Sequence, residues 1–338
     1  MSKFRVGLIG CGGRMTGAHM KAFERMDDVQ VVAIAEPVEE RRLATQARYG
    51  LEDSRCYKDH NEFYAHENKE TLDAIFIAIE PCAHDRNTEL PAVEMGIPFL
   101  IEKPMAMDMD LAKEISDKIE AKGLITAVGF QDRYLDLMDI IKEEVPKHKA
   151  GGLVWGAWIG GIPGVWWWQK KSTCGGQLLE QNIHILDNLR WLYGEPKTLY
   201  ATATTGIVKP GVDAKPEYDT DDHSTVVMTF ENGVTATLVS GCYVQGRFDT
   251  KLSGLTISMN DMVIEYHLRN NVILKTAKET HNFYRQEDQT YTLDRAFVDA
   301  VKTNNPALVR SPYQDAYKSL KLCDDANKSM ATGEVFNY

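Results

Sequence analysis

The sequence lacks the features that mark membrane, secreted and disulfide-rich proteins. No run of apolar residues approaches the roughly 20 that a membrane-spanning helix needs, and the first residues, Met1–Arg5, show no apolar signal-peptide stretch. The six cysteines stand singly, without a CxxC pair, which favours free thiols in a reducing compartment over a disulfide framework. We therefore expect a soluble, cytoplasmic protein.

Positive charge is also scarce. The 38 Lys and Arg residues are outnumbered by 49 Asp and Glu residues, and the net charge is -11. A chain with this charge is not expected to bind nucleic acid or an anionic membrane. Repeats and low-complexity segments are missing as well, whereas a hydrophobic fraction of 43% is typical of a globular protein. The length of 338 residues allows two domains, each with its own core.

The first 130 residues alternate short apolar strands with amphipathic helices. We expect strands at 5–10, 29–35, 54–57, 74–79, 98–101 and 125–130, and helices at 14–25, 38–49, 86–95 and 108–121. Gly50, Gly96 and Gly123 follow three of these helices as stop signals. The alternation predicts an α/β fold, a doubly wound parallel sheet forming a Rossmann domain at residues 1–130.

From residue 131 onward the pattern changes to strand-like runs rich in Val, Thr and Tyr. The clearest runs lie at 198–205, 224–230, 234–240, 255–259 and 262–267, and the helices are expected at 134–144, 177–193, 292–302 and 312–330. Glu231-Asn232-Gly233 is a hairpin signal between two of the strands. We predict a C-terminal α+β domain at residues 131–338, built on a large, mainly antiparallel sheet, with the last helices able to pack back on the first domain.

A glycine turn follows the first strand, in Gly10-Cys11-Gly12-Gly13-Arg14-Met15. Such a turn lets the backbone approach a pyrophosphate at a helix N-terminus, although Met15 replaces the third glycine of G-x-G-x-x-G. Glu36 ends the second strand, where a carboxylate can accept both ribose hydroxyls and would repel a 2′-phosphate. We predict NAD as the cofactor, with NADP as the second choice because Arg41 and Arg42 lie close by. The alternative is a nucleotide fold that has lost its ligand.

Ionisable residues occur in two further places that suggest chemistry. Lys103, in Glu102-Lys103-Pro104, follows a buried strand, at the edge where open α/β sheets bind ligands. A poorly solvated ammonium there can have a lowered pKa. Glu180 and His184 are four residues apart on a predicted helix and so share one face. Spacing alone is more typical of an ordinary surface pair.

Together these motifs resemble the Gfo/Idh/MocA family, named for glucose–fructose oxidoreductase, inositol dehydrogenase and a rhizopine-catabolism protein. The resemblance rests on Val6–Gly12, Glu102–Pro104 and Gly175–Asp187, and extends over nearly the whole chain. It implies a Rossmann domain, a second domain whose open sheet often mediates oligomer contacts, and NAD(P)-dependent oxidation or reduction of a sugar, polyol or inositol hydroxyl. We therefore expect a small carbohydrate substrate and a homodimer or homotetramer.

The resemblance also implies roles for individual residues. Lys103 is the expected active-site lysine, Glu102 is expected near the nicotinamide ribose, and the Lys103–Pro104 bond is a candidate for the cis form. The residues expected to contact the cofactor are Gly10, Gly12, Gly13, Arg14, Met15, Glu36, Ile79, Glu80, Pro81, His84, Glu102, Lys103 and Gln131. Those expected to contact the substrate are Lys103, Arg133, Tyr134, Trp168, Glu180 and His184.

The predicted catalytic residues are Lys103, His184 and Glu180. Hydride leaves a carbinol carbon readily only if the hydroxyl proton is removed as the carbonyl forms, and a histidine suits that task. Glu180 would orient the imidazole of His184, and Lys103 would hydrogen-bond the developing alkoxide. The roles of His184 and Lys103 could also be exchanged.

Three positions depart from the family pattern. Glu80-Pro81 replaces the usual Thr-Pro, Asp85 occupies the usual histidine position with His84 one residue earlier, and Glu180 replaces an aspartate. The extra acids suggest a second function, a glycosidase that keeps its NAD, oxidises the sugar transiently and eliminates the aglycone. A third alternative is a non-catalytic sugar sensor, since fold does not fix function.

Two other clusters allow structural explanations. Trp155, Trp158 and Trp166–Trp168 could stack on a sugar, with Trp168 the preferred candidate, or could fill a core or a subunit interface. Arg133 could form a salt bridge between domains instead of contacting substrate. Asp221-Asp222-His223 lacks compact ligand spacing and is explained by turn formation, so we expect no metal.

Overall fold

The computed structural model describes residues 3–148, 152–244 and 253–338. The chain forms two compact units, one made of Met1–Tyr134 and Asp288–Tyr317 and the other of Leu135–Glu287 and Lys318–Tyr338. The chain therefore returns to the first unit after most of the second is complete. The expected domain boundary after residue 130 stays a prediction.

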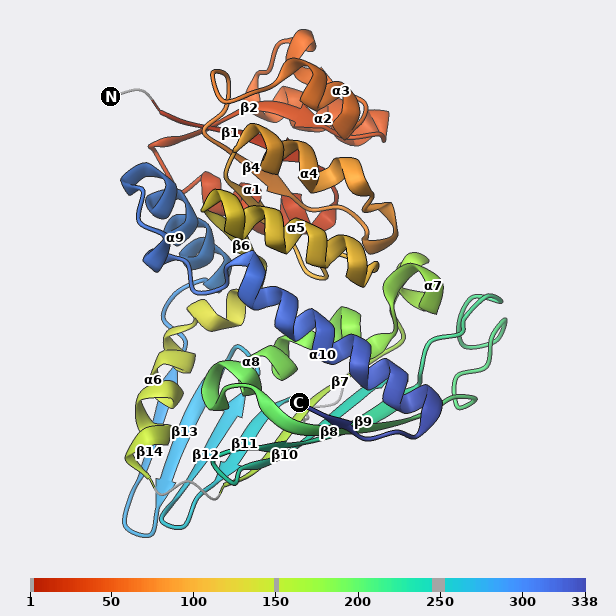
Figure 1. The fold of residues 1–338 in the computed structure, drawn as a ribbon, viewed down its shortest axis with the longest axis vertical. Helices are drawn as coiled ribbons and strands as arrows, with labels where there is room; N and C mark the ends of the chain where they lie inside the picture. Colours follow the sequence, from red (N-terminus) through yellow and green to blue (C-terminus); the bar gives the residue numbers. More distant parts are fainter. Residues whose placement is uncertain (1–2, 149–151, 245–252) are drawn as a thin grey trace. The chain divides into compact units, whose positions relative to one another are not determined.

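The first unit contains a six-stranded sheet in the order β3-β2-β1-β4-β5-β6, in which every neighbouring pair is parallel. Figure 1 labels β1, β2, β4 and β6 of this sheet. Its strands are β1 (Phe4–Ile9), β2 (Val29–Ala35), β3 (Cys56–Tyr57), β4 (Ala74–Ile77), β5 (Phe99–Ile101) and β6 (Thr126–Val128). The strand order reverses between β1 and β4, which is the switch point where such sheets bind ligands. The predicted doubly wound parallel sheet is confirmed.

Helices pack on this sheet. They are α1 (Met20–Phe23), α2 (Glu39–Tyr49), α3 (His60–His66), α4 (Arg86–Met95), α5 (Met109–Lys122) and α9 (Gln289–Thr303). Phe23 of α1 and Phe297 of α9 both meet Phe76 of β4 edge-on, with ring centroids 4.8 and 5.4 Å apart. These contacts explain why residues Asp288–Tyr317 belong to the first unit: α9 completes its core.

The helix expected at 14–25 is not regular. A π-helix spans Met15–His19 and only then does α1 begin. Short π-helical turns inside α-helices are rare and often occur at functional sites. The helix α3 was not expected from the sequence at all.

The second unit contains a nine-stranded sheet in the order β14-β13-β12-β11-β7-β10-β9-β8-β15. Its strands are β7 (Leu153–Gly160), β8 (Pro196–Thr204), β9 (His223–Phe230), β10 (Thr235–Cys242), β11 (Gly254–Ser258), β12 (Met262–His267), β13 (Asn271–Thr276), β14 (Thr280–Tyr284) and β15 (Phe336–Asn337). Among the described strand pairs of this sheet, only β7–β10 is parallel, so the mainly antiparallel sheet is confirmed. Glu231-Asn232-Gly233 joins β9 to β10, as the hairpin signal predicts.

The helices of the second unit are α6 (Asp136–Glu144), α7 (Lys171–Cys174), α8 (Ile183–Tyr193) and α10 (Tyr313–Thr332), the last of which begins in the first unit. Helix α8 packs on β7 and β10, and α6 packs on β13. Alternate residues of β9, such as Val226 and Met228, are buried, whereas the residues between them are half-buried. Leu153 and Trp155 of β7 and Tyr200 of β8 are exposed, which indicates that helices cover only one face of this sheet.

No helix within the described ranges is both long and apolar enough to cross a membrane.

Candidate active site

The glycine turn after β1 is shaped by close packing. Gly10 has φ +83°, and a Cβ there would lie 2.3 Å from the Ala78 carbonyl oxygen, so only glycine fits. Gly12 and Gly13 face open space instead, with no atom closer than 3.8 Å to a Cβ built on either. The turn is therefore held tightly against the end of β4, while its next residues leave room for a ligand to approach the backbone.

Glu36 is buried at the end of β2. Its Oε2 accepts a 2.7 Å hydrogen bond from the Cys11 amide and its Oε1 accepts a 2.9 Å bond from the Val38 amide. The carboxylate thereby links the glycine turn to the start of α2. Because each carboxylate oxygen can accept more than one hydrogen bond, Glu36 can still receive ribose hydroxyls. The open turn and this acid together fit a dinucleotide.

Glu102, directly after β5, is the centre of a buried charge network. Its Oε1 accepts hydrogen bonds from Arg14 Nε at 2.8 Å and His19 Nε2 at 3.0 Å. The other ring nitrogen of His19, Nδ1, lies 2.9 Å from Asp294 Oδ2 of α9. Gly129 makes room for this carboxylate, since a Cβ there would lie 2.6 Å from it. Arg14 of the glycine turn is thus bound to Glu102, the residue that precedes Lys103.

The network shifts the pKa values of its members. Burial alone would lower the pKa of His19, but the carboxylates of Asp294 and Glu102 outweigh it and raise this pKa to about 9. Burial would raise the pKa of Glu102, but Arg14 and His19 hold it well below its usual range. Near neutral pH, His19 is therefore an imidazolium and Glu102 a carboxylate.

Lys103 follows Glu102 at the carboxyl edge of the sheet. Its side chain is half-buried, and its amide donates to Glu102 Oε2 at 3.3 Å. The Lys103–Pro104 peptide bond is cis, as expected. The buried network therefore holds the main chain of Lys103 in place. Lys103 and the glycine turn belong to the same unit.

In the second unit, the helix expected at 177–193 begins with a π-helix at Leu178–Asn182 before α8. Glu180 lies in the π-helix and His184 in α8, and both are buried. The Asn182 side chain anchors this turn to the Val239 carbonyl of β10 at 2.9 Å. Because both side chains are buried, they do not form the surface ion pair that their four-residue spacing also allowed.

Trp158 of β7 is an aromatic neighbour of His184, with ring centroids 5.8 Å apart. Trp168, the preferred candidate, instead donates from Nε1 to Gln177 Oε1 at 2.9 Å and stacks on Trp167. A substrate contact by Trp168 stays a prediction.

Several other expected site residues have structural partners. Arg133 is buried and binds the Arg310 carbonyl at 2.8 Å and Asp315 at 2.5 Å, within the first unit. The Tyr134 hydroxyl accepts a hydrogen bond from the Arg310 amide at 2.7 Å.

The segment after β4 also has structural contacts. His84 Nδ1 lies 3.1 Å from Glu89, and Asp85 caps α4. Gln131 is buried, whereas Ile79 and Glu80 are half-buried. Their cofactor and substrate roles stay predictions.

The Asp221-Asp222-His223 segment is held by structural contacts. Asp221 pairs with Lys171 at 3.2 Å, and Asp222 accepts the Ile207 amide at 2.7 Å. No group of three or more His, Cys, Asp or Glu side chains in the described part of the chain could hold a metal ion.

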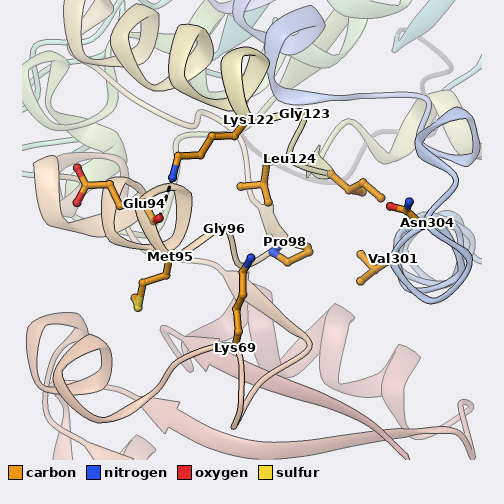
Figure 2. Close-up of a pocket in the computed structure, with 11 residues that line it drawn as sticks. Lys69, Glu94, Met95, Gly96, Pro98, Lys122, Gly123, Leu124, Val301 and Asn304 are labelled. Carbon is orange, nitrogen blue, oxygen red and sulfur yellow. Dashed lines mark hydrogen bonds between the residues drawn. The ribbon is translucent and has the colours of Figure 1, made fainter.

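A surface hollow in the first unit lies at the opposite edge of the sheet from Lys103. It is lined by the ends of three helices, at Gly96 after α4, Gly123 after α5 and Asn304 after α9 (Figure 2). Lys122 Nζ donates to the Glu94 carbonyl at 2.8 Å. Lysine is favoured at helix C-termini, where carbonyls lack partners. The hollow contains no predicted site residue, and Lys122 caps the end of α4 there.

Sequence reasoning missed His19, Asp294 and the role of Trp158 beside His184. His19 stood in the expected first helix, only nine residues after Gly10, which is the one local signal available. Asp294 lies 275 residues further along the chain, and no local pattern connects the two.

Comparisons with known proteins agree with this architecture. Residues 4–130 match the model of an oxidoreductase family with an NAD-binding Rossmann fold, and residues 153–257 match the GFO/IDH/MocA C-terminal domain. The rhizopine catabolism protein MocA of Rhizobium meliloti is 26% identical over 63% of this chain and 66% of its own length, just under two thirds. Levoglucosan dehydrogenase of Pseudarthrobacter phenanthrenivorans is 24% identical over 82% of this chain and 78% of its own length.

Among solved structures, an inositol dehydrogenase homologue from Azotobacter vinelandii, complexed with NAD+, has a TM-score of 0.85 at 15% identity. The similarity covers 100% of this chain and 98% of that one. At this identity the similarity supports the fold, while the two family matches together cover most of the sequence. The chain belongs to the Gfo/Idh/MocA family of oxidoreductases, with an NAD-binding Rossmann fold at its N-terminus.

Proposed function

We propose that the protein is an NAD-dependent dehydrogenase acting on a secondary hydroxyl of a sugar, glycoside or inositol. The observation that carries the proposal is the joining of the glycine turn to Glu102-Lys103-Pro104 through the Arg14–Glu102 ion pair, at 2.7 Å. This contact joins the glycine turn to the residue that precedes the half-buried Lys103. The names of relatives, such as levoglucosan dehydrogenase and inositol 2-dehydrogenase, support the substrate class.

Bound NAD would supply the acceptor for the hydride that leaves the carbinol carbon. In the proposed mechanism the His184 imidazole takes the hydroxyl proton, and buried Glu180 orients the imidazole and stabilises its charged form. The Lys103 ammonium donates a hydrogen bond to the oxygen as negative charge develops on it. The backbone of Gly12 and Gly13 would bind the pyrophosphate, and Glu36 would bind the adenosine ribose. Gly10, whose amide already donates to the Ala35 carbonyl at 2.8 Å, would let the pyrophosphate approach the turn.

The test is a screen of the purified protein with NAD and a panel of sugars, inositols and aryl glycosides, following NADH absorbance and aglycone release together. Net NADH formation is the expected result. Aglycone release without net NADH would replace the proposal with the NAD-retaining glycosidase. Carbohydrate binding without either signal would favour the sensor.

The preference for NAD over NADP should depend on Glu36. A 2′-phosphate would meet this buried carboxylate, and like charges in contact cost several kcal/mol, so we expect wild-type kcat/KM with NADP to be at least about tenfold lower than with NAD. Glu36→Ser should reduce the difference between kcat/KM with NAD and kcat/KM with NADP, as measured by steady-state kinetics with both cofactors. Glu40→Gln, at an exposed residue of α2, is the control. Equal use of both cofactors by the wild type would contradict the prediction.

A further inference from the structure

His19 lies between two carboxylates in a position that its neighbours fix. Its ring is 1% exposed and packs against the edge of Phe76, with centroids 5.7 Å apart. Nε2 is 3.0 Å from Glu102, and Nδ1 is 3.0 and 2.9 Å from the two oxygens of Asp294. Nothing in the proposed mechanism uses His19 or Asp294 directly.

The carboxylates on both sides of the ring favour its charged form, and the charged ring opposes the rise that burial causes in the pKa of Asp294. A neutral imidazole has one donor and one acceptor nitrogen, so it would direct a lone pair at one of the carboxylates. An imidazolium donates to both. With the partly exposed Arg14 also bound to Glu102, two positive and two negative groups then balance. Loss of the charge on His19 or on Asp294 would leave the other as a buried charge with fewer partners.

Asp294 is held by helix α9 rather than by the strands around the glycine turn. Asp288 caps the helix by accepting the Thr290 and Tyr291 amides at 3.0 and 2.9 Å. Leu293 and Phe297 are buried on either side of Asp294 in the core of the first unit. The carboxylate is therefore attached to a rigid element and cannot readily move away from His19.

The other end of the network meets the main chain of the lysine. Glu102 Oε1 accepts from His19 and Arg14, while Oε2 faces the Lys103 amide at 3.3 Å. A rotation of the Glu102 carboxylate would thus disturb both Arg14 in the glycine turn and the backbone of Lys103.

We propose that Asp294 and His19 are positioning residues, which fix the Glu102 carboxylate and through it hold the glycine turn and Lys103 in the arrangement that hydride transfer requires. The inference rests on the proposed function. It assigns part of the reaction geometry to helix α9, which follows most of the second unit in the chain.

The test combines an NMR measurement, which needs neither cofactor nor substrate, with steady-state kinetics. In the apoprotein with ¹⁵N-labelled histidine, NMR should show both His19 nitrogens protonated at about pH 7 and the ring titrating near the value of about 9 set by its two carboxylates; His19→Gln identifies the signal. Asp294→Asn keeps the side chain's size but removes its charge, and His19 should then titrate at lower pH.

In turnover, Asp294→Asn should lower kcat by about 10–100-fold, because small displacements of reacting groups are costly. The KM for the carbohydrate should change much less. The NAD dissociation constant, measured by tryptophan fluorescence, should rise by a smaller factor than kcat falls, because the turn that binds NAD loses only part of its support. Tyr57→Phe is the control. It removes a 2.8 Å hydrogen bond to buried Glu67 in the same unit, and should lower the melting temperature without this loss of kcat.

Several results would overturn the inference. One is a neutral His19 ring in the wild type at neutral pH, which needs no variant to measure. Others are an Asp294→Asn enzyme with wild-type kcat, or one whose loss matches that of Tyr57→Phe. If the wild type shows no NAD-dependent turnover with any compound, the proposed function itself fails and the inference fails with it.

Discussion

Lys103→Met is expected to lower kcat by about 10²–10³-fold, the usual effect of removing one donor to a developing oxyanion. The methionine keeps most of the side chain's length and apolar surface but removes the ammonium. NAD affinity should change little, because the pyrophosphate and ribose are expected to bind at the glycine turn and Glu36. Steady-state kinetics and a fluorescence titration with NAD measure the two quantities separately.

The matched control is Lys113→Met on α5, at a lysine 56% exposed that pairs with Asp117 in the next helical turn. Surface pairs of this kind contribute little to stability, so this variant should behave as wild type. Lys103→Met with unchanged kcat would remove Lys103 from the mechanism. A large loss of NAD affinity would assign it to cofactor binding instead.

His184→Ala is expected to lower kcat by about 10²–10⁴-fold, with NAD affinity little changed. The imidazole is buried beside Trp158 and follows the π-helix that carries Glu180, so the variant loses the proposed proton acceptor while the anchor at Asn182 remains. In the wild type, kcat/KM should fall at acid pH because the base of the free enzyme becomes protonated. In His184→Ala this pH dependence should change.

His281→Ala, on exposed β14 of the same unit, is the control for this variant. Near wild-type turnover in His184→Ala would exclude His184 as the base. A variant that loses activity only in proportion to a lowered melting temperature would indicate a structural histidine.

Much of the fold follows from local sequence patterns. The helix 86–95 and the strand 262–267 have the predicted bounds, because a regular apolar pattern ends there at a clear turn or cap. The helix α3 and the strand β14 were missed. All five residues of β14 are exposed, so it has no alternation between buried and exposed positions that a pattern could reveal.

The site was less predictable than the fold. Motifs identified the glycine turn, Glu36 and Lys103, since each belongs to one short segment. The two π-helices could not be anticipated, because one extra residue per turn hardly alters the apolar pattern. The His19–Asp294 contact depends on packing between distant segments, through Phe76 and Phe297. Substrate identity, oligomeric state and cellular compartment stay predictions.

The late return of the chain to its first unit has a consequence for synthesis on the ribosome. When residue 134 has emerged, all six strands of the parallel sheet are present, but the surface that Leu293 and Phe297 will cover is still open. Domains usually fold as the chain emerges, N-terminal part first. Here the cofactor-binding unit cannot reach its final packing until nearly the whole protein has been made, and an N-terminal fragment would expose that apolar surface and leave His19 without Asp294.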